Sequence, residues 1–513
     1  MKLVALLVAI AACGGAEAQI DPIAQPIEPM VRLPKAPGMF SPSLVAIDDH
    51  AARKKDDPTI GEQLADVDSC STCHADAAAQ WNSSAHSFAS FGNPIYRANV
   101  EMERTAMGKD TSRHCAGCHD MPLMVDGLMT TGEVPSKDLR AHTGVSCSLC
   151  HGVKSVTKDG NGSYVWSRER IEAPDVSDAA SVARHKAQVS VKPLGTELCV
   201  GCHRGFLSPD MGDSNMPVHL SGLDEPGMWR NSAWAGNGMG RVDKVDPKNC
   251  IDCHMEREPA STKELGAKNG TIASHRFLGG HTWMASMRGD SDHLHRLQSK
   301  LEGAASIDIA GGYIEGPSHT WALPADGMDV KGGQTVDLDV VIRNLLVGHR
   351  FPGGVLDIQD AWIEVEVADA SGKRIGESGL RHEKDKNDDD THVLRTLVVD
   401  DKGEVLEQHE MSKFRTQIAT QTLAPREAQS IRYAFEIPEI GAVAADGDRP
   451  AAPSQSHARD AGRGVHGGED GRWQLIPHGR EGRARRDVGP VQGAADHVDR
   501  GDQDPDRRGR PGE

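Results

Sequence analysis

The clearest hydrophobic pattern in the chain is a period of two that begins near residue 330. Apolar residues occupy every second position in 336–342, 363–367 and 431–437. This alternation places one face of a strand against a core and the other toward water. Turns rich in Asp and Gly at 369–372 and 400–403 follow such runs. The pattern predicts an antiparallel β-sandwich-like domain over residues 321–440.

The preceding stretch, residues 61–320, shows no sustained period of either kind. Gly, Ser and Asn are frequent in it, and few windows keep the apolar spacing of an amphipathic helix. We therefore expect short helices joined by loops, a mostly α and irregular domain with little regular structure. The β domain is predicted to follow it.

The start of the chain has the composition of an export signal. Within residues 1–18, Lys2 precedes an apolar core that is too short to span a bilayer. The segment Ala16-Glu17-Ala18 fits a cleavage site, whereas the residues up to Cys13 resemble a lipobox that would make Cys13 a lipid anchor; both readings stay open. Residues 19–60 are rich in proline and predict an extended linker.

The end of the chain changes composition again. Residues 441–513 are rich in Arg, Gly and Asp, lack Lys and have almost no apolar periodicity. Such a segment buries too little apolar surface to offset its ordering entropy, which predicts a disordered tail. The sudden loss of Lys also fits an out-of-frame translation product, in which the last strands of the β domain would be missing.

Composition narrows the function classes. The 513 residues carry a formal net charge of −18, which predicts no basic face and no nucleic-acid partner. Aromatic residues make up only 4%, whereas His is abundant at 24. The abundance of His favours ligands for a borderline metal. The shortage of aromatic residues favours a non-protein group that supplies flat apolar surface. After the leader, no apolar run is long enough to span a membrane.

Ten of the 11 cysteines fall in five C-x-x-C-H motifs. The motifs are Cys70-Ser-Thr-Cys73-His74, Cys115-Ala-Gly-Cys118-His119, Cys147-Ser-Leu-Cys150-His151, Cys199-Val-Gly-Cys202-His203 and Cys250-Ile-Asp-Cys253-His254. At this spacing the two thiols add to the vinyl groups of haem and the histidine binds the iron. The motifs therefore predict five covalently attached haem c groups. Zinc sites or disulfides would not require a histidine after each pair.

The motif histidines, His74, His119, His151, His203 and His254, are the predicted proximal ligands. An electron-transfer haem usually has a second axial ligand, because an open iron face invites ligand chemistry. Five further histidines have favourable local contexts for this role: His86, His114, His142, His275 and His349. Methionine is the competing ligand, but methionines more often fill cores. His382, His392 and His409 are expected to be solvated.

Segments around the motifs carry a resemblance to a known family. Trp81 and Ser84-Ala85-His86 follow the first motif, Gly144-Val145-Ser146 precedes the third, and His275-Arg276-Phe277-x-Gly279-Gly280 follows the fifth. Over residues 65–355 the chain resembles multihaem cytochromes related to the tetrahaem carriers of the hydroxylamine-oxidation pathway, and Gly348-His349-Arg350-Phe351-Pro352-Gly353 is similar to an element of larger members. The resemblance implies stacked haem pairs, mainly bis-His ligation, and distal ligands at His86, His114, His142 and His275.

The resulting expectation is an exported electron-transfer protein of the periplasm, the outer membrane or the cell exterior. Its acidic surface would dock redox protein partners, either as a single chain or as an oligomer. The alternative is a reductase or oxidase of a small nitrogen or sulfur species at one five-coordinate haem, near Arg276, His281 and Arg288. All five motifs keep His where related nitrite reductases have one Lys, which lowers the case for an enzyme. A third reading is a structural haem module that docks through its β domain.

Overall fold

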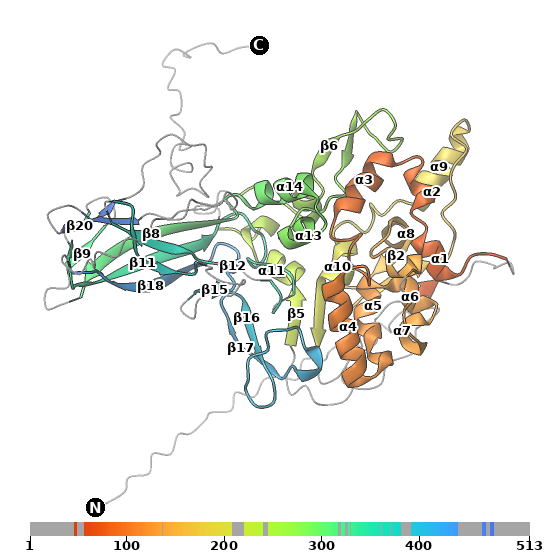
Figure 1. Cartoon of the computed structure of the whole chain (residues 1–513). Coiled ribbons are helices and arrows are strands. Elements are labelled where there is room, and N and C mark those ends of the chain that lie inside the picture. The colour runs from red at the N-terminus through yellow and green to blue at the C-terminus, as the bar shows by residue number, and fades with distance from the viewer. Residues whose placement is uncertain are drawn as a thin grey trace, which may run out of the picture.

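In the computed structural model, the described residues are 46–48, 56–439 and two short strands near the end of the chain. Within 56–439 the gaps are 136, 208–219, 240–244, 316–319, 324–326, 329, 356, 360, 370 and 381–390. The predicted leader with Cys13, most of the predicted linker and most of the tail lie outside these residues. Figure 1 shows a helical region and a region of long strands side by side. No helix in the described part of the chain has the length and apolar character to cross a membrane.

The helical region consists of short elements, as the sequence predicts. The helices are α1 (Ile60–Ala65), α2 (Asp68–Ser71), α3 (Ala75–Ser83), α4 (Pro94–Met107), η1 (Lys109–Ser112), α5 (Arg113–His119), α6 (Met121–Val125), α7 (Leu128–Thr131), η2 (Leu139–Ala141), α8 (Cys147–His151), α9 (Ala179–Gln188), α10 (Glu197–His203), α11 (Glu225–Arg230), η4 (Ala233–Ala235), α12 (Cys250–His254), α13 (Thr282–Met287) and α14 (Ser291–Leu301). Short strands join them: β1 (Ala46–Asp48), β2 (Val153–Val156), β3 (Tyr164–Ser167), β4 (Arg204–Leu207), β5 (Leu220–Asp224), β6 (Arg257–Pro259) and β7 (Thr271–Ala273).

Most of the C-x-x-C-H motifs lie on a helical turn that ends at the motif histidine. Helices α5, α8, α10 and α12 all end there. Side-chain caps fix the start of two of them: Ser146 accepts a hydrogen bond from the amide of Leu149, and Asn249 forms a capping box with Asp252. The helical turn brings both cysteines and the histidine of a motif to one side of the chain.

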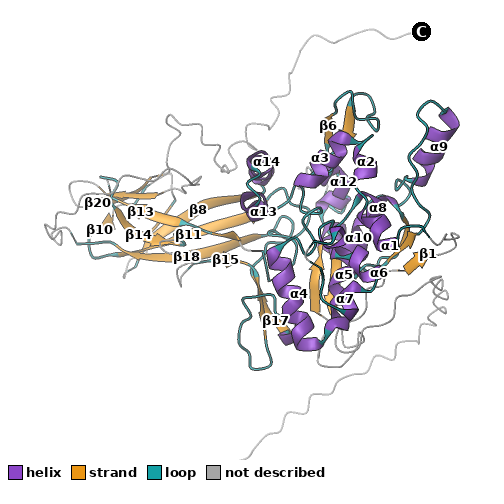
Figure 2. Cartoon of the chain, turned by 45° about the vertical axis from the view of Figure 1, so that its right-hand side comes forward, coloured by secondary structure: helices purple, strands orange, loops and turns teal. Residues whose placement is uncertain are grey.

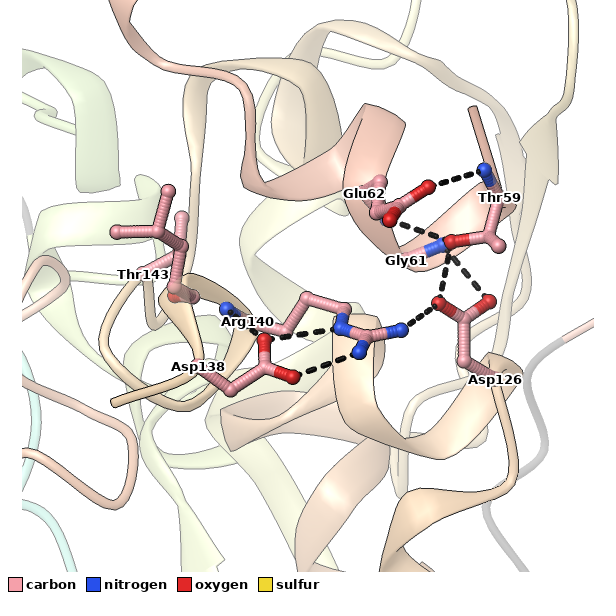
Figure 3. Close-up of polar contacts among 8 residues, drawn as sticks. Thr59, Gly61, Glu62, Asp126, Asp138, Arg140 and Thr143 are labelled. Atoms are coloured by element: carbon pink, nitrogen blue, oxygen red, sulfur yellow. Dashed lines mark hydrogen bonds and ion pairs between the residues drawn. The ribbon is translucent and has the colours of Figure 1, made fainter. Parts of the chain in front are cut away.

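A polar cluster fixes the N-terminal helix α1 against the rest of the helical region (Figure 3). Asp126 accepts hydrogen bonds from the hydroxyl of Thr59 at 2.5 Å and from the amide of Gly61 at 3.1 Å. The same carboxylate pairs with Arg140 at 2.6 Å, and Arg140 also pairs with Asp138. Because Arg140 is largely buried, these pairs neutralise a charge that would otherwise be costly to bury. They set the position of the turn 139–143.

The second region is antiparallel, as predicted. Strands β8 (Ala305–Ile314), β9 (Thr320–Ala322), β11 (Thr335–Asn344) and β18 (Ala428–Glu436) form a four-stranded sheet in the order β18-β11-β8-β9. Alternate residues of β11 from Val336 to Ile342 are buried in its core. The sheet begins at Ala305, ahead of the predicted boundary at 321, because the Gly-rich β8 has a weak alternation signal.

The two-sheet sandwich is not confirmed. The other described strands pair mainly in twos: β12 (Ala361–Trp362) with β15 (Val393–Leu394), β13 (Val365–Ala368) with β14 (Arg374–Ser378), and β16 (Thr396–Val399) with β17 (Thr416–Thr420). Figure 2 shows β13 and β14 beside the long strands β8 and β11, whereas β17 lies apart from these strands. Local alternation identifies strands, but it does not specify which strands share a sheet.

Two strands fall within the predicted disordered tail. Strand β19 (Gly464–Gly467) pairs with β20 (Arg472–Ile476), which also pairs with β10 (Val330–Lys331). The disorder predicted for residues 441–513 stays a prediction. The rest of 441–513 lies outside the described residues.

The two regions meet around helix α11 and the loop after β11. The backbone of Gly348 lies close to the rings of Trp229 and Trp234, which a Cβ atom on Gly348 would approach within 3.2–3.3 Å. Nearby, Glu225 of α11 accepts a hydrogen bond from the amide of Gly354 at 2.6 Å, and its other carboxylate oxygen is buried without a partner among the described residues. Burial raises the pKa of Glu225 to about 7.

We expect Glu225→Gln to stabilise the protein at pH 8. The folded pKa of Glu225 exceeds its ordinary value of 4.5, so the protein loses stability as the pH rises from about 4.5 to 7. The uncharged variant escapes this loss and should gain about 1–3 kcal/mol at pH 8, with little change at pH 4.5. Denaturant unfolding at both pH values measures the difference. Glu133→Gln, at a side chain that is 89% exposed, is the control. An equal effect of Glu225→Gln at both pH values would contradict the assignment.

Candidate functional site

The thiols of different motifs lie next to one another. Hydrogen-bonding contacts join Cys70 with Cys147, Cys199 with Cys250, and Cys118 with Cys202. None of the ten motif cysteines, all of them in the described part of the chain, forms a disulfide. Nor do three or more His, Cys, Asp or Glu side chains of the described residues converge on one point, as a zinc site would require. The first motif is therefore adjacent to the third, and the fourth is adjacent to the second and the fifth.

Four of the five motif histidines have a second histidine ring nearby, from a distant part of the chain. The ring centroids are 6.3 Å apart for His74 and His185, 6.1 Å for His203 and His86, 6.5 Å for His151 and His275, and 6.3 Å for His254 and His349. A first-row metal–imidazole bond is about 2.0 Å long and the nitrogen lies about 1.2 Å from the ring centre, so an iron between two imidazoles separates the centroids by about 6.4 Å. The four spacings fit bis-histidine iron.

Hydrogen bonds from Nδ1 orient seven of the motif histidines and their partners. The acceptors are carbonyl oxygens of Ala89 for His119, Val189 for His151, Leu278 for His254, Glu172 for His185, Ala273 for His275 and Arg350 for His349, and the carboxylate of Glu264 for His74, all at 2.7–2.9 Å. An imidazole that donates from Nδ1 keeps the lone pair of Nε2 for a metal. The donor set therefore suits haem iron.

Burial favours the neutral form of six of the paired histidines. It lowers the pKa of His86 to about 3, and that of His203 and His349 to about 4. Burial also lowers the pKa values of His151, His254 and His275. Only the neutral imidazole binds a metal, so these sites need no deprotonation step at neutral pH.

Close backbone contacts hold His86 in place. Gly144 adopts φ +60°, and a Cβ atom there would lie 2.3 Å from the carbonyl oxygen of His86. This approach allows the amide of Val145 to donate to that oxygen at 2.9 Å, while Trp81 donates to the carbonyl of Val145 at 2.7 Å. The ring of Phe277 then packs edge-on against His86 at 4.3 Å. Gly144 and Trp81 thus help to hold the backbone at His86 in place.

The loop after β11 brings His349 to the fifth motif from the strand region. A Cβ atom on Gly353 would lie 2.7 Å from the His349 ring, so glycine is required there. Phe351 exchanges two backbone hydrogen bonds with Leu423, and Arg350 donates to the carbonyl of Thr422. This segment thus extends from the strand region to the fifth motif.

His185 is the partner that the sequence analysis did not rank. It lies on α9, a helix with no buried residue, and its ring is almost parallel to that of His74, with 11° between the planes. No motif, glycine or aromatic residue next to it marks it as a ligand. An exposed helix with a single histidine between two motifs is the only available signal, and it is weak.

At the second motif, the ring of His119 stacks on that of Tyr96, with the ring centroids 4.6 Å apart and 20° between the planes. Nδ1 of His142 lies beside Gly92, where a Cβ atom would approach it to 3.0 Å. The roles predicted for His114 and His142 stay predictions.

The other singled-out polar residues have different surroundings from those expected. His409, predicted to be solvated, instead contacts the buried carboxylate of Asp357 at 2.9 Å, so that prediction is wrong. His392 is partly buried, and His382 lies outside the described residues. Arg276 lies 3.4 Å from Glu258, and Arg288 donates to the carbonyl of Asn82. Both guanidinium groups are thus already occupied by protein acceptors.

Comparison with known proteins agrees with the chemistry of the motifs. Residues 69–152, which contain the first three motifs, match the family described as cytochrome c554 and c-prime. Among solved structures, a penta-haem cytochrome c552 from Thermochromatium tepidum is similar, with a TM-score of 0.45 and 17% identity over 74% of this chain and 89% of that one. No curated protein matches the chain. Residues 69–152 are thus similar to that family, and this match together with the five motifs supports covalently bound haem c and haem-based electron transfer.

Proposed function

We propose that the chain is an exported electron-transfer protein with five haem c groups, four of them ligated by two histidines. The observation that carries the proposal is the 6.1–6.5 Å spacing of four histidine pairs. Haem supplies a one-electron iron couple, and two neutral imidazoles favour a six-coordinate iron that exchanges electrons without binding substrate. Each motif would hold one haem through its two cysteines and its histidine.

The adjacency of the motifs supports a branched route for the electrons. The first motif contacts the third through Cys70 and Cys147. The third lies near the fourth through Cys150 and Cys202, and the fourth contacts both the second and the fifth. We propose the series first, third, fourth and fifth, with the second as a branch from the fourth. The acidic chain would exchange electrons with a protein that presents a complementary surface, in the periplasm or at the cell envelope.

The alternative function is the reduction or oxidation of a small nitrogen or sulfur species at one five-coordinate haem, because an iron with one axial ligand can bind a small molecule.

Electron paramagnetic resonance of the oxidised holoprotein tests both functions. Nearly parallel imidazole planes give a rhombic low-spin signal, whereas steeply crossed planes give a highly anisotropic one. With angles of 11°, 28° and 18° for three pairs and 67° for His86 and His203, we expect three signals of the first kind and one of the second. A high-spin signal from a fifth iron would support the second candidate, and a low-spin one would exclude it. Fewer than five haems per chain would refute the proposed cofactor content.

His185→Ala should open the iron at the first motif. The variant loses the ring that lies 6.3 Å from His74, so one rhombic low-spin signal should become high-spin while the haem count stays the same. Helix α9 buries no residue of its own, so limited proteolysis should cut it faster than in the wild type. His295→Ala, at an exposed histidine of α14, is the control. An unchanged spectrum would rule out His185 as a ligand.

A further inference from the structure

We infer that Glu264 holds the haem at the first motif at a lower reduction potential than its histidine ligands alone would give. The inference rests on the proposed attachment of haem to Cys70, Cys73 and His74. Glu264 does not touch the iron; it is a positioning residue that acts through the imidazole of His74.

The carboxylate of Glu264 is buried and completely hydrogen-bonded. Its side chain is 1% exposed, and Oε1 lies 2.8 Å from Nδ1 of His74. The amide of Gly266 also donates to Oε1, and the amides of Asp76 and Ala77 donate to Oε2 at 3.1 Å. All four partners place an N–H group against the two carboxylate oxygens, and such a set of donors favours the charged form of the carboxyl group. The group next to His74 is therefore an anion.

This arrangement distinguishes the first motif from the second, third and fifth. The Nδ1 atoms of His119, His151 and His254 donate to neutral backbone carbonyl oxygens. A hydrogen bond to a carboxylate is charge-assisted and stronger, and it makes the imidazole a more basic ligand. A more electron-rich ligand stabilises ferric over ferrous iron, which lowers the reduction potential.

The loop that carries Glu264 is built around this contact. A Cβ atom on Gly266 would lie 2.9 Å from both Glu264 Oε1 and His74 Nδ1, so only glycine fits beside the hydrogen bond between these two atoms. The amide of Leu265 donates to the carbonyl of Cys73 at 3.0 Å, which ties the loop to the motif itself. Asp76 accepts a hydrogen bond from the hydroxyl of Ser261 at the other end of the loop.

The test compares holoprotein variants by potentiometric titration followed by electron paramagnetic resonance. The haem of the first motif is the one whose low-spin signal His185→Ala removes. In Glu264→Gln its reduction equilibrium should shift at least tenfold toward the ferrous form, which is 59 mV for one electron, while the other haems keep their potentials. Asp76→Asn removes an equal charge close to the same motif without touching His74, and should give a much smaller shift.

A second readout follows the iron–histidine bond directly. In ferrous His185→Ala protein the first-motif iron has His74 as its one protein ligand, and its iron–histidine stretch in resonance Raman spectra should fall when Glu264→Gln is added. Gly266→Ala, which crowds the same bond, should shift the potential in the same direction if Glu264→Gln fails to fold. Equal shifts in Glu264→Gln and Asp76→Asn, or an unchanged stretch, would overturn the inference with the proposed function intact. Loss of haem from the wild-type first motif would instead refute the proposed function.

Discussion

The pairing of histidines from distant segments is the interaction on which the helical region depends. Each of the four pairs joins residues that are on the order of 100 positions apart, and in the chain-entropy model a cross-link that closes such a loop contributes about 5 kcal/mol. The region has short helices and a modest apolar core, and helix α9 contributes no buried side chain. With the proposed ligation, iron coordination would therefore do much of what apolar packing does elsewhere, and we expect the region to order only with its haem groups bound.

A single hairpin connects several of these centres. Strands β6 and β7 follow the fifth motif, and the loop between them carries Glu264 to His74. Strand β7 then leads to His275, which pairs with His151, and to Phe277, whose ring contacts both His275 and His86. A displacement of this hairpin would disturb the ligands of the first, third and fourth motifs together. The environments of those irons are thus coupled through protein as well as through space.

The sequence predicts the parts of this structure that are encoded locally. C-x-x-C-H is a complete chemical unit within five residues, and the alternation of β11 is visible within ten. Which histidine lies opposite each motif histidine is a tertiary property. The sequence singles out His86, His275 and His349 only because glycines or aromatic residues next to them mark close packing. His185 has no such neighbours. The contact of Glu264 with His74 spans 190 positions, and no local pattern distinguishes this glutamate from the others. The same limit applies to the sandwich, because strand alternation does not specify which strands pair.

The contact of His349 with His254 bears on the role of the strand region. If the strand region were only a docking module attached to a complete cytochrome, it would not need a histidine whose ring centroid lies 6.3 Å from that of a motif histidine. Here the strand region supplies His349 at that distance. The backbone of its loop packs at Gly348 against the rings of Trp229 and Trp234. Glu225 of α11 holds the far side of the same loop through Gly354. Any shift of the strands relative to the helices would therefore move the proposed iron ligand His349. If His349 is that ligand, the strand region is part of the proposed electron-transfer unit and not a separate docking module.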